Sequence, residues 1–145
     1  MRVHKTGDRD FPRFGYDNKG IYTDKTVFIG IGSHLKYLMA FLNSSIGKWL
    51  IMEYVTKLDT GGYMMQKTFL DKIPVIVPSQ DQEEQIINIV DKILEAELSK
   101  TSTKALEKEV DELLYKLYNI TPQEQKIIEG TDSTQKHTHL QALEA

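Results

Sequence analysis

Two short apolar runs near the start of the chain have the spacing of β-strands. Residues 11–16 and 21–31 flank a polar Asp-Asn-Lys-Gly turn, whose residue types readily adopt the left-handed conformations of a hairpin turn. In the second run Val27, Ile29 and Ile31 alternate onto one face, as they do in a strand. The pattern predicts two strands that belong to a small β-sheet.

The hydrophobic period then becomes that of an α-helix. A first apolar stripe ends at Asn43, which is predicted to be a left-handed C-cap, and Ser44 or Ser45 begins a second helix. The second helix carries Trp49, which we expect in the core, and Gly47. Because glycine weakens a helix by about 1 kcal/mol relative to alanine, its presence here predicts that another part of the chain packs closely against it.

A loop followed by a second β-branched run occupies residues 60–78. Two consecutive glycines open the loop and allow close approach of another backbone. The run 73–77 contains Pro74 and is followed by Pro78, and these prolines favour an edge strand over a central one. The loop before this strand is predicted to present side chains for binding from a rigid scaffold.

The second half of the chain has the pattern of a helical hairpin. Apolar residues recur at helical spacing over residues 80–98 and 104–118, which predicts two antiparallel helices. Capping-box signatures begin at Ser79 and at Thr121, and the second one starts a short helix that ends at Gly130.

Together these patterns predict an α+β fold. A small β-sheet packs on two core helices and is followed by an antiparallel helical hairpin and a short C-terminal helix. The predicted units are a flexible first segment, an α+β domain, the hairpin with its short helix, and a polar tail: residues 1–10, 11–79, 80–130 and 131–145. The polar first segment suggests a piece of a longer chain.

The net charge of −3 hides an uneven distribution. Residues 1–72 contain 11 Lys or Arg against 7 Asp or Glu, whereas residues 73–145 contain 7 against 14. The first half could therefore face a polyanion, although a chance spread of solvated charges explains the same numbers. The chain has no cysteine and no apolar run near the roughly 18 residues that span a bilayer. We therefore expect a cytoplasmic protein without a membrane partner.

Catalytic patterns are missing from the sequence. It contains no glycine-rich phosphate loop, no HExxH, no GxSxG and no nucleophile beside an evident base. The carboxylates fall on the polar faces of the predicted hairpin, where solvated ion pairs are their usual role. We expect no catalysis by this chain alone, and no metal or cofactor bound to it.

Four stretches of the chain resemble one known family: LKYLMAFLNSSIGKWL, GGYMMQKTFLDKIPVIVPS, EEQIINIVDKIL and EVDELLYKLYNITPQEQKIIE. They are similar to the TaqI-like C-terminal specificity domain, the target-recognition region of type IIG restriction-modification enzymes and related adenine-specific DNA methyltransferases. The resemblance covers about residues 11–130. Its most specific parts are Leu42-Asn43-Ser44, Ile73-Pro74 before the helix that bears Gln85, and Asp111-Glu112-Leu113 with Leu117-Tyr118. The Ile-Pro part is also similar to type I specificity subunits.

The resemblance implies sequence-specific recognition of double-stranded DNA, with the helical hairpin as a spacer or docking surface. It also implies that an adenine-specific methyltransferase domain, which would use S-adenosylmethionine, precedes this segment in the parent chain. The present sequence departs from such enzymes because it has no Asn-Pro-Pro-Tyr motif and no cofactor-binding glycine motif. It therefore looks like the non-catalytic recognition part of a type II restriction-modification enzyme.

Candidate DNA contacts rest on residue chemistry, because the resemblance transfers no base-reading residue. Lysine and arginine suit phosphates, and glutamine can pair bidentately with adenine in the major groove. These criteria, applied to turns and element ends, select seven residues: Arg13, Tyr16, Lys19, Lys57, Tyr63, Gln66 and Lys67. The alternative for the last four is a solvated loop in which Tyr63 and Met64 pack inward.

A second class of function stays open at this point. In it the chain is a protein-interaction module, in which the hairpin of residues 80–118 docks a partner and the first half is structural. Cations clustered on one concave face of the first half would favour DNA. An apolar patch of more than several hundred Å² on the hairpin would favour a protein partner.

Overall fold

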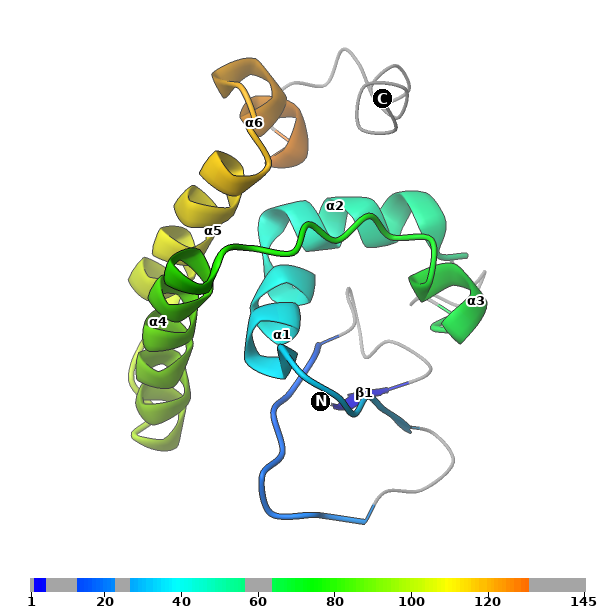
Figure 1. Cartoon of the computed structure of the whole chain (residues 1–145), viewed down its shortest axis with the longest axis vertical. Coiled ribbons are helices and arrows are strands. Elements are labelled where there is room, and N and C mark those ends of the chain that lie inside the picture. Colours follow the sequence, from blue (N-terminus) through cyan, green and yellow to red (C-terminus); the bar gives the residue numbers. More distant parts are fainter. Residues whose placement is uncertain (1, 5–12, 23–26, 57–63, 131–145) are drawn as a thin grey trace.

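The computed structural model describes residues 2–4, 13–22, 27–56 and 64–130 of the chain. In order, the elements are β1 (Arg2–His4), β2 (Val27–Ile29), α1 (Leu35–Asn43), α2 (Ser45–Tyr54), α3 (Lys67–Leu70), α4 (Gln80–Leu98), α5 (Lys104–Leu117) and α6 (Pro122–Ile128). Figure 1 shows α1 and α2 meeting at a corner, with α4 and α5 packed together beside it.

The predicted α+β class is wrong, because the described part is mostly helical and no sheet packs on its core helices. Within the described ranges, β1 and β2 form a two-stranded antiparallel sheet, with Val3 opposite Phe28. Neither predicted run, 11–16 nor 73–77, contributes a strand to a sheet within the described residues. The physical reason is that side chains bond the backbone groups which a neighbouring strand would otherwise have bonded.

A tight corner joins α1 to α2. Asn43 is the last residue of α1 and has no positive φ, so the predicted left-handed cap is wrong. Ser44 caps α2, and its hydroxyl oxygen accepts from the Gly47 N–H at 3.1 Å. The close packing predicted at Gly47 is confirmed, because a Cβ built there would lie 2.0 Å from the carbonyl oxygen of Phe41.

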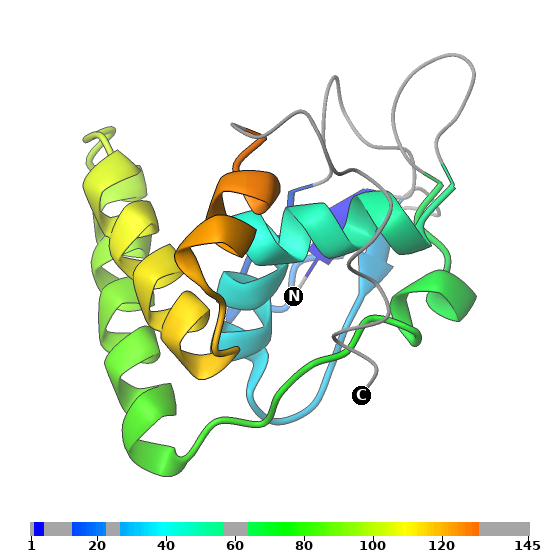
Figure 2. The same ribbon diagram turned by 90° about the horizontal axis from the view of Figure 1, so that it is seen from above.

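The helices α4 and α5 form the predicted antiparallel hairpin. The bounds of α4 match the prediction, and α5 ends at Leu117, one residue early. Figure 2 shows the two helices lying side by side. Both capping boxes are confirmed, at Ser79 with Gln82 and at Thr121 with Glu124. Among the described helices, none combines the length and the apolar character needed to cross a membrane.

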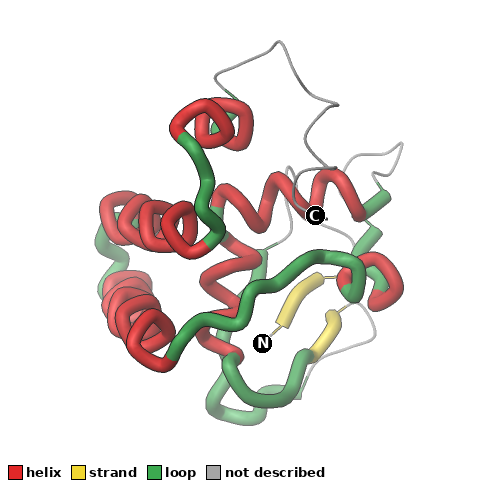
Figure 3. Tube along the Cα trace, turned by 45° about the horizontal axis from the view of Figure 1, so that its top comes forward, coloured by secondary structure: helices red, strands yellow, loops and turns green. Residues whose placement is uncertain are grey.

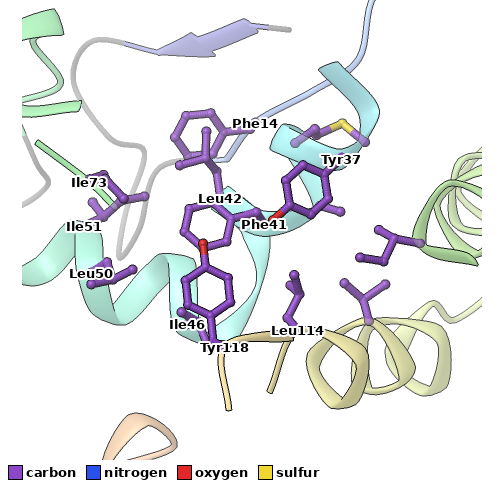
Figure 4. Packing of buried hydrophobic residues seen from close by; sticks show 14 of the residues in the cluster. Phe14, Tyr37, Phe41, Leu42, Ile46, Leu50, Ile51, Ile73, Leu114 and Tyr118 are labelled. Atoms are coloured by element: carbon purple, nitrogen blue, oxygen red, sulfur yellow. The ribbon is translucent and has the colours of Figure 1, made fainter. Parts of the chain in front are cut away.

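One hydrophobic cluster joins the corner to the hairpin. Phe41, Ile51 and Leu114 are fully buried, and the Phe41 ring stacks on Tyr118 with the centroids 5.5 Å apart (Figure 4). The expected place of Trp49 in the core is confirmed only in part, because Trp49 is half-buried and packs against the cluster, whereas Leu50 and Ile51 of the same helix are buried within it. The core therefore lies between α1, α2 and the hairpin, without a sheet beneath it.

Candidate functional site

Two buried tyrosines hold residues 73–78 as an extended segment, which Figure 3 shows as the loop between α3 and α4. The Tyr37 hydroxyl donates to the carbonyl oxygen of Ile76 at 2.6 Å. The Tyr118 hydroxyl donates to the carbonyl oxygen of Pro74 at 3.1 Å and accepts from the Ile76 N–H at 3.0 Å. Burial raises the pKa of both tyrosines, so both hydroxyls keep their protons at neutral pH.

Two further polar contacts fix the corner between α1 and α2. The Asn43 carboxamide accepts from the Phe14 N–H at 3.0 Å and donates to the Phe14 carbonyl oxygen at 2.8 Å. The Asp111 carboxylate of α5 accepts from the Ser45 N–H at 2.8 Å and from the Ser45 hydroxyl at 2.6 Å. A negative charge is thereby placed at the N-terminus of α2, where the helix dipole favours it.

The residues most specific to the family resemblance take part in these contacts. Asn43 bonds Phe14, Asp111 bonds Ser45, and Tyr118 bonds the segment that begins with Ile73 and Pro74. Their polar atoms are engaged inside the fold. The residues on which the expected resemblance depends therefore have structural roles in this fold.

The α3 segment, residues 66–72, is a short exposed stretch anchored at both ends. Met65 before it is 1% exposed and Ile73 after it is 7% exposed. Between these anchors the exposed side chains are Gln66, Lys67, Thr68, Asp71 and Lys72. Lys67 and Asp71 form an ion pair at 2.5 Å, but both are more than half exposed, so the pair contributes little to stability. The anchors hold a polar, lysine-bearing surface in a defined position.

Three other candidates lie on residues 13–22, the segment that comes before β2 in the chain and runs past α1. Arg13 and Lys19 are exposed, whereas Tyr16 is half-buried with the Lys36 ammonium 5.5 Å from its ring centroid. The predicted turn is present, because the Asp17 carboxylate accepts from two backbone N–H groups of the turn. Among the described residues on either side of it, no two paired strands are joined by this turn, so the predicted hairpin is not seen there.

The seven candidates do not form one cluster. Gln66 and Lys67 are adjacent at the beginning of α3, and Figure 1 shows this helix apart from the segment that carries residues 13–19. Lys57 and Tyr63 lie outside the described residues. The clustering of cations on one concave face, which would favour DNA over a protein partner, is therefore not seen among the described residues.

In the loop before α3, the residue that packs inward is Met65 and not Met64, which the sequence had suggested as an alternative. Met64 is 37% exposed, whereas its neighbour Met65 is 1% exposed and belongs to the core. Lys72, which is a cation of the first half but not one of the seven candidates, lies exposed at the far end of the α3 segment. The sequence pattern that could have identified Lys72 is a pair of lysines in a short polar stretch between two apolar anchors.

The charge asymmetry persists in the described part of the chain. Its residues between 13 and 72 include six Lys or Arg against three Asp or Glu, and residues 73–130 include six against twelve. Lys36 pairs with Asp91 and Lys67 with Asp71. The remaining cations of the first group form no ion pair with described residues: Arg13, Lys19, Lys48 and Lys72.

The hairpin lacks an open apolar patch among its described residues. Leu98, at the end of α4, is its one large hydrophobic side chain that is exposed. The surface expected for a docking module is therefore not found on α4 and α5. Within the described ranges there is also no group of three or more His, Cys, Asp or Glu side chains placed to hold a metal ion.

Comparison with known proteins adds no relative to this picture. No protein-family model matches the sequence, and no match was found among the curated proteins or the solved structures.

Proposed function

We propose that this chain is a non-catalytic, sequence-specific DNA target-recognition domain that positions a separate adenine-specific methyltransferase. The observation that carries the proposal is the α3 segment. Its buried anchors Met65 and Ile73 hold an exposed glutamine, Gln66, and two exposed lysines, Lys67 and Lys72, on one short surface stretch. Base recognition needs such a rigidly placed hydrogen-bonding side chain, and phosphate binding needs cations beside it.

The uneven charge supports the same assignment. Double-stranded DNA is a polyanion, so it approaches the cation-rich first half more favourably than the acidic hairpin. The hairpin then faces away from DNA and toward the rest of the parent enzyme. S-adenosylmethionine belongs to the methyltransferase domain in this proposal, and the present chain contributes neither catalyst nor cofactor site.

Binding by the chain alone is expected to be weak, because its net charge is negative. A selection from random duplex DNA at low salt should still enrich one short sequence over the starting pool. Fluorescence anisotropy with the selected and scrambled duplexes then measures the preference. Equal binding of both duplexes, or no enrichment, would contradict the proposal.

The contribution of lysine to phosphate binding is tested by Lys67→Ala. We expect weaker binding to all duplexes alike, and a slope of log affinity against log salt that is smaller by about 0.9. The matched control is Lys108→Ala on α5, which removes an exposed lysine from the acidic half. Equal effects of the two changes would show that the α3 segment does not face DNA.

The contribution of glutamine to base reading is tested by Gln66→Ala. We expect a loss of about 1–3 kcal/mol of preference at one base pair, with the salt slope unchanged. Gln85→Ala, an exposed glutamine on α4, is the control. A Gln66 variant that keeps the full preference would remove this residue from the reading surface.

A further inference from the structure

The extended segment between α3 and α4 has one bonded edge and one unbonded edge. Toward the core, the carbonyl oxygen of Pro74 and both backbone groups of Ile76 are bonded by the two tyrosine hydroxyls. In an extended chain, successive residues direct their N–H and C=O groups to opposite sides. The backbone groups of Val75 and Val77 therefore point away from the tyrosines, and they form no hydrogen bond with described residues.

The two prolines leave this outer edge intact. Pro74 and Pro78 are two residues to either side of Ile76, so their ring nitrogens, which carry no hydrogen, belong to the inner edge. Proline usually blunts an exposed strand edge by removing a donor from it. Here both donors of the outer edge remain, and Val75 and Val77 are 40% and 76% exposed.

We propose that this edge pairs with the same edge of a second copy of the chain, in an antiparallel arrangement centred on Ile76. In this register Val75 of one copy lies opposite Val77 of the other. Each of the two Val75–Val77 pairs exchanges two N–H to C=O hydrogen bonds, as a hydrogen-bonded antiparallel pair does. The edge is self-complementary, which a two-fold symmetric interface requires.

Charge at the two ends of the segment favours a second copy as the occupant. Lys72 precedes the segment and Asp81 follows it, and both side chains are exposed. Neither forms an ion pair with a described residue. In this register Asp81 of each copy lies opposite the Asp71–Lys72 end of the other, where Asp71 is already paired with Lys67, so the attraction between Lys72 and Asp81 occurs twice. Residues 73–80 carry no charge themselves, so like charges do not meet along the paired edges.

The paired edge is short, and this sets the expected affinity. Three residues from each copy bury far less than the area of about 1,200 Å² found in stable interfaces. We therefore expect a reversible dimer with a dissociation constant of roughly 0.1–1 mM. Gln66 and Lys67, which we assign to DNA, are not part of the paired edge, whereas Lys72 belongs both to the α3 segment and to the charged contact of the dimer.

The first test is sedimentation equilibrium of the full chain up to millimolar concentration, at about 0.15 M salt to limit general repulsion. We expect a concentration-dependent dimer, together with slower amide exchange at Val75 and Val77 as the concentration rises. Val77→Pro removes the N–H of residue 77 from the outer edge of both copies and should weaken the dimer about tenfold or more. Val77→Thr keeps this N–H and should still dimerise.

Thermal melting of each variant checks that the monomer folds normally. A chain that stays monomeric at the highest concentration, or a folded Val77→Pro variant that dimerises as before, would overturn the proposal.

The second test does not alter the extended segment. Lys72→Glu and Asp81→Lys should each weaken the dimer, because each homodimer then contains two like-charged contacts. An equimolar mixture of the two variants should restore association, because both contacts of the mixed dimer are again attractive. Unchanged association of either single variant, or no gain on mixing, would exclude this antiparallel register.

Discussion

The corner between α1 and α2 and the α3 segment are built in opposite ways, although each is a short connection between longer elements. At the corner, Asn43, Ser45 and Asp111 are held by hydrogen bonds of 2.6–3.0 Å to residues far away in the sequence. The α3 segment has buried residues only at its two ends, and the ion pair of Lys67 is made within the segment itself.

This difference separates folding from function in the proposed recognition domain. A change at the corner leaves buried polar groups without partners, and such groups are costly inside a protein. A change in the α3 segment alters a solvated surface and leaves the core intact. The comparison therefore predicts large stability effects at the corner and binding effects without stability effects in α3.

The largest effect is expected for Gly47→Ala. The added Cβ would lie 2.0 Å from the Phe41 carbonyl oxygen and 2.8 Å from the Leu42 Cα, and both are backbone atoms that cannot rotate away. We expect a loss of more than about 4 kcal/mol in the free energy of unfolding, although alanine favours helix. Urea unfolding followed by circular dichroism measures it. Gly15→Ala is the control, because nothing lies within 4 Å of a Cβ there, and it should change stability by less than about 0.5 kcal/mol.

The next effect is expected for Asp111→Ala, which removes both acceptors of Ser45. The Ser45 N–H and hydroxyl then lose a charged partner at a partly buried site, which costs about 2–3 kcal/mol. Asp91→Ala removes a carboxylate from an exposed ion pair with Lys36 and should cost no more than about 0.5 kcal/mol. Similar losses for the two variants in urea unfolding would show that the corner does not depend on this carboxylate.

A smaller effect is expected for Tyr118→Phe. The ring and its stacking on Phe41 are kept, but the Pro74 carbonyl and the Ile76 N–H lose their shared hydroxyl. The expected loss is about 1–2 kcal/mol. Tyr22→Phe, at a fully exposed position, should be neutral in the same unfolding measurement. An unchanged free energy of unfolding in the Tyr118→Phe variant would mean that water replaces the hydroxyl without a loss of stability.

Alkaline pH should lower the free energy of unfolding through the buried tyrosines. Burial raises the pKa of Tyr37, Tyr115 and Tyr118 above the usual value of about 10. Above that pH the unfolded chain gives up these protons while the folded chain retains them, so the free energy of unfolding falls as the pH rises. Below that pH these groups make no pH-dependent contribution. Unfolding curves at about pH 9, 10 and 11 check the sign, and a constant stability over this range would contradict it.

The helices were predictable because their evidence is local. Helical spacing and capping boxes such as Ser79 with Gln82 depend on residues within one turn, and they gave the bounds of α4 correctly. The strands predicted over 11–16 and 73–77 are wrong, because a run of β-branched residues shows only that the chain prefers an extended conformation, whereas β2 does lie within the predicted run 21–31. Whether Ile73–Val77 meets another strand or the hydroxyls of Tyr37 and Tyr118 depends on contacts across about 40 residues, which no local pattern contains.

The candidate site was predictable only in part, for a similar reason. Gln66 and Lys67 were selected by residue type, and their exposure follows from the apolar anchors on either side. Tyr16 was selected by the same chemistry, but it is half-buried beneath Lys36, a neighbour 20 residues away. Side-chain chemistry identifies which residues could bind DNA, whereas the fold decides which of them remain available.

The smallest stability effect is expected for Lys67→Ala, which tests directly whether a change in the α3 segment affects binding without affecting stability. The Lys67–Asp71 pair is an exposed pair four residues apart, a type that contributes about 0.3–0.5 kcal/mol. The variant should therefore unfold within about 0.5 kcal/mol of the original chain, while its affinity for duplex DNA falls. A loss of more than about 1 kcal/mol in urea unfolding would mean that the α3 segment supports the fold. Its effect on DNA binding could then no longer be assigned to a lost phosphate contact.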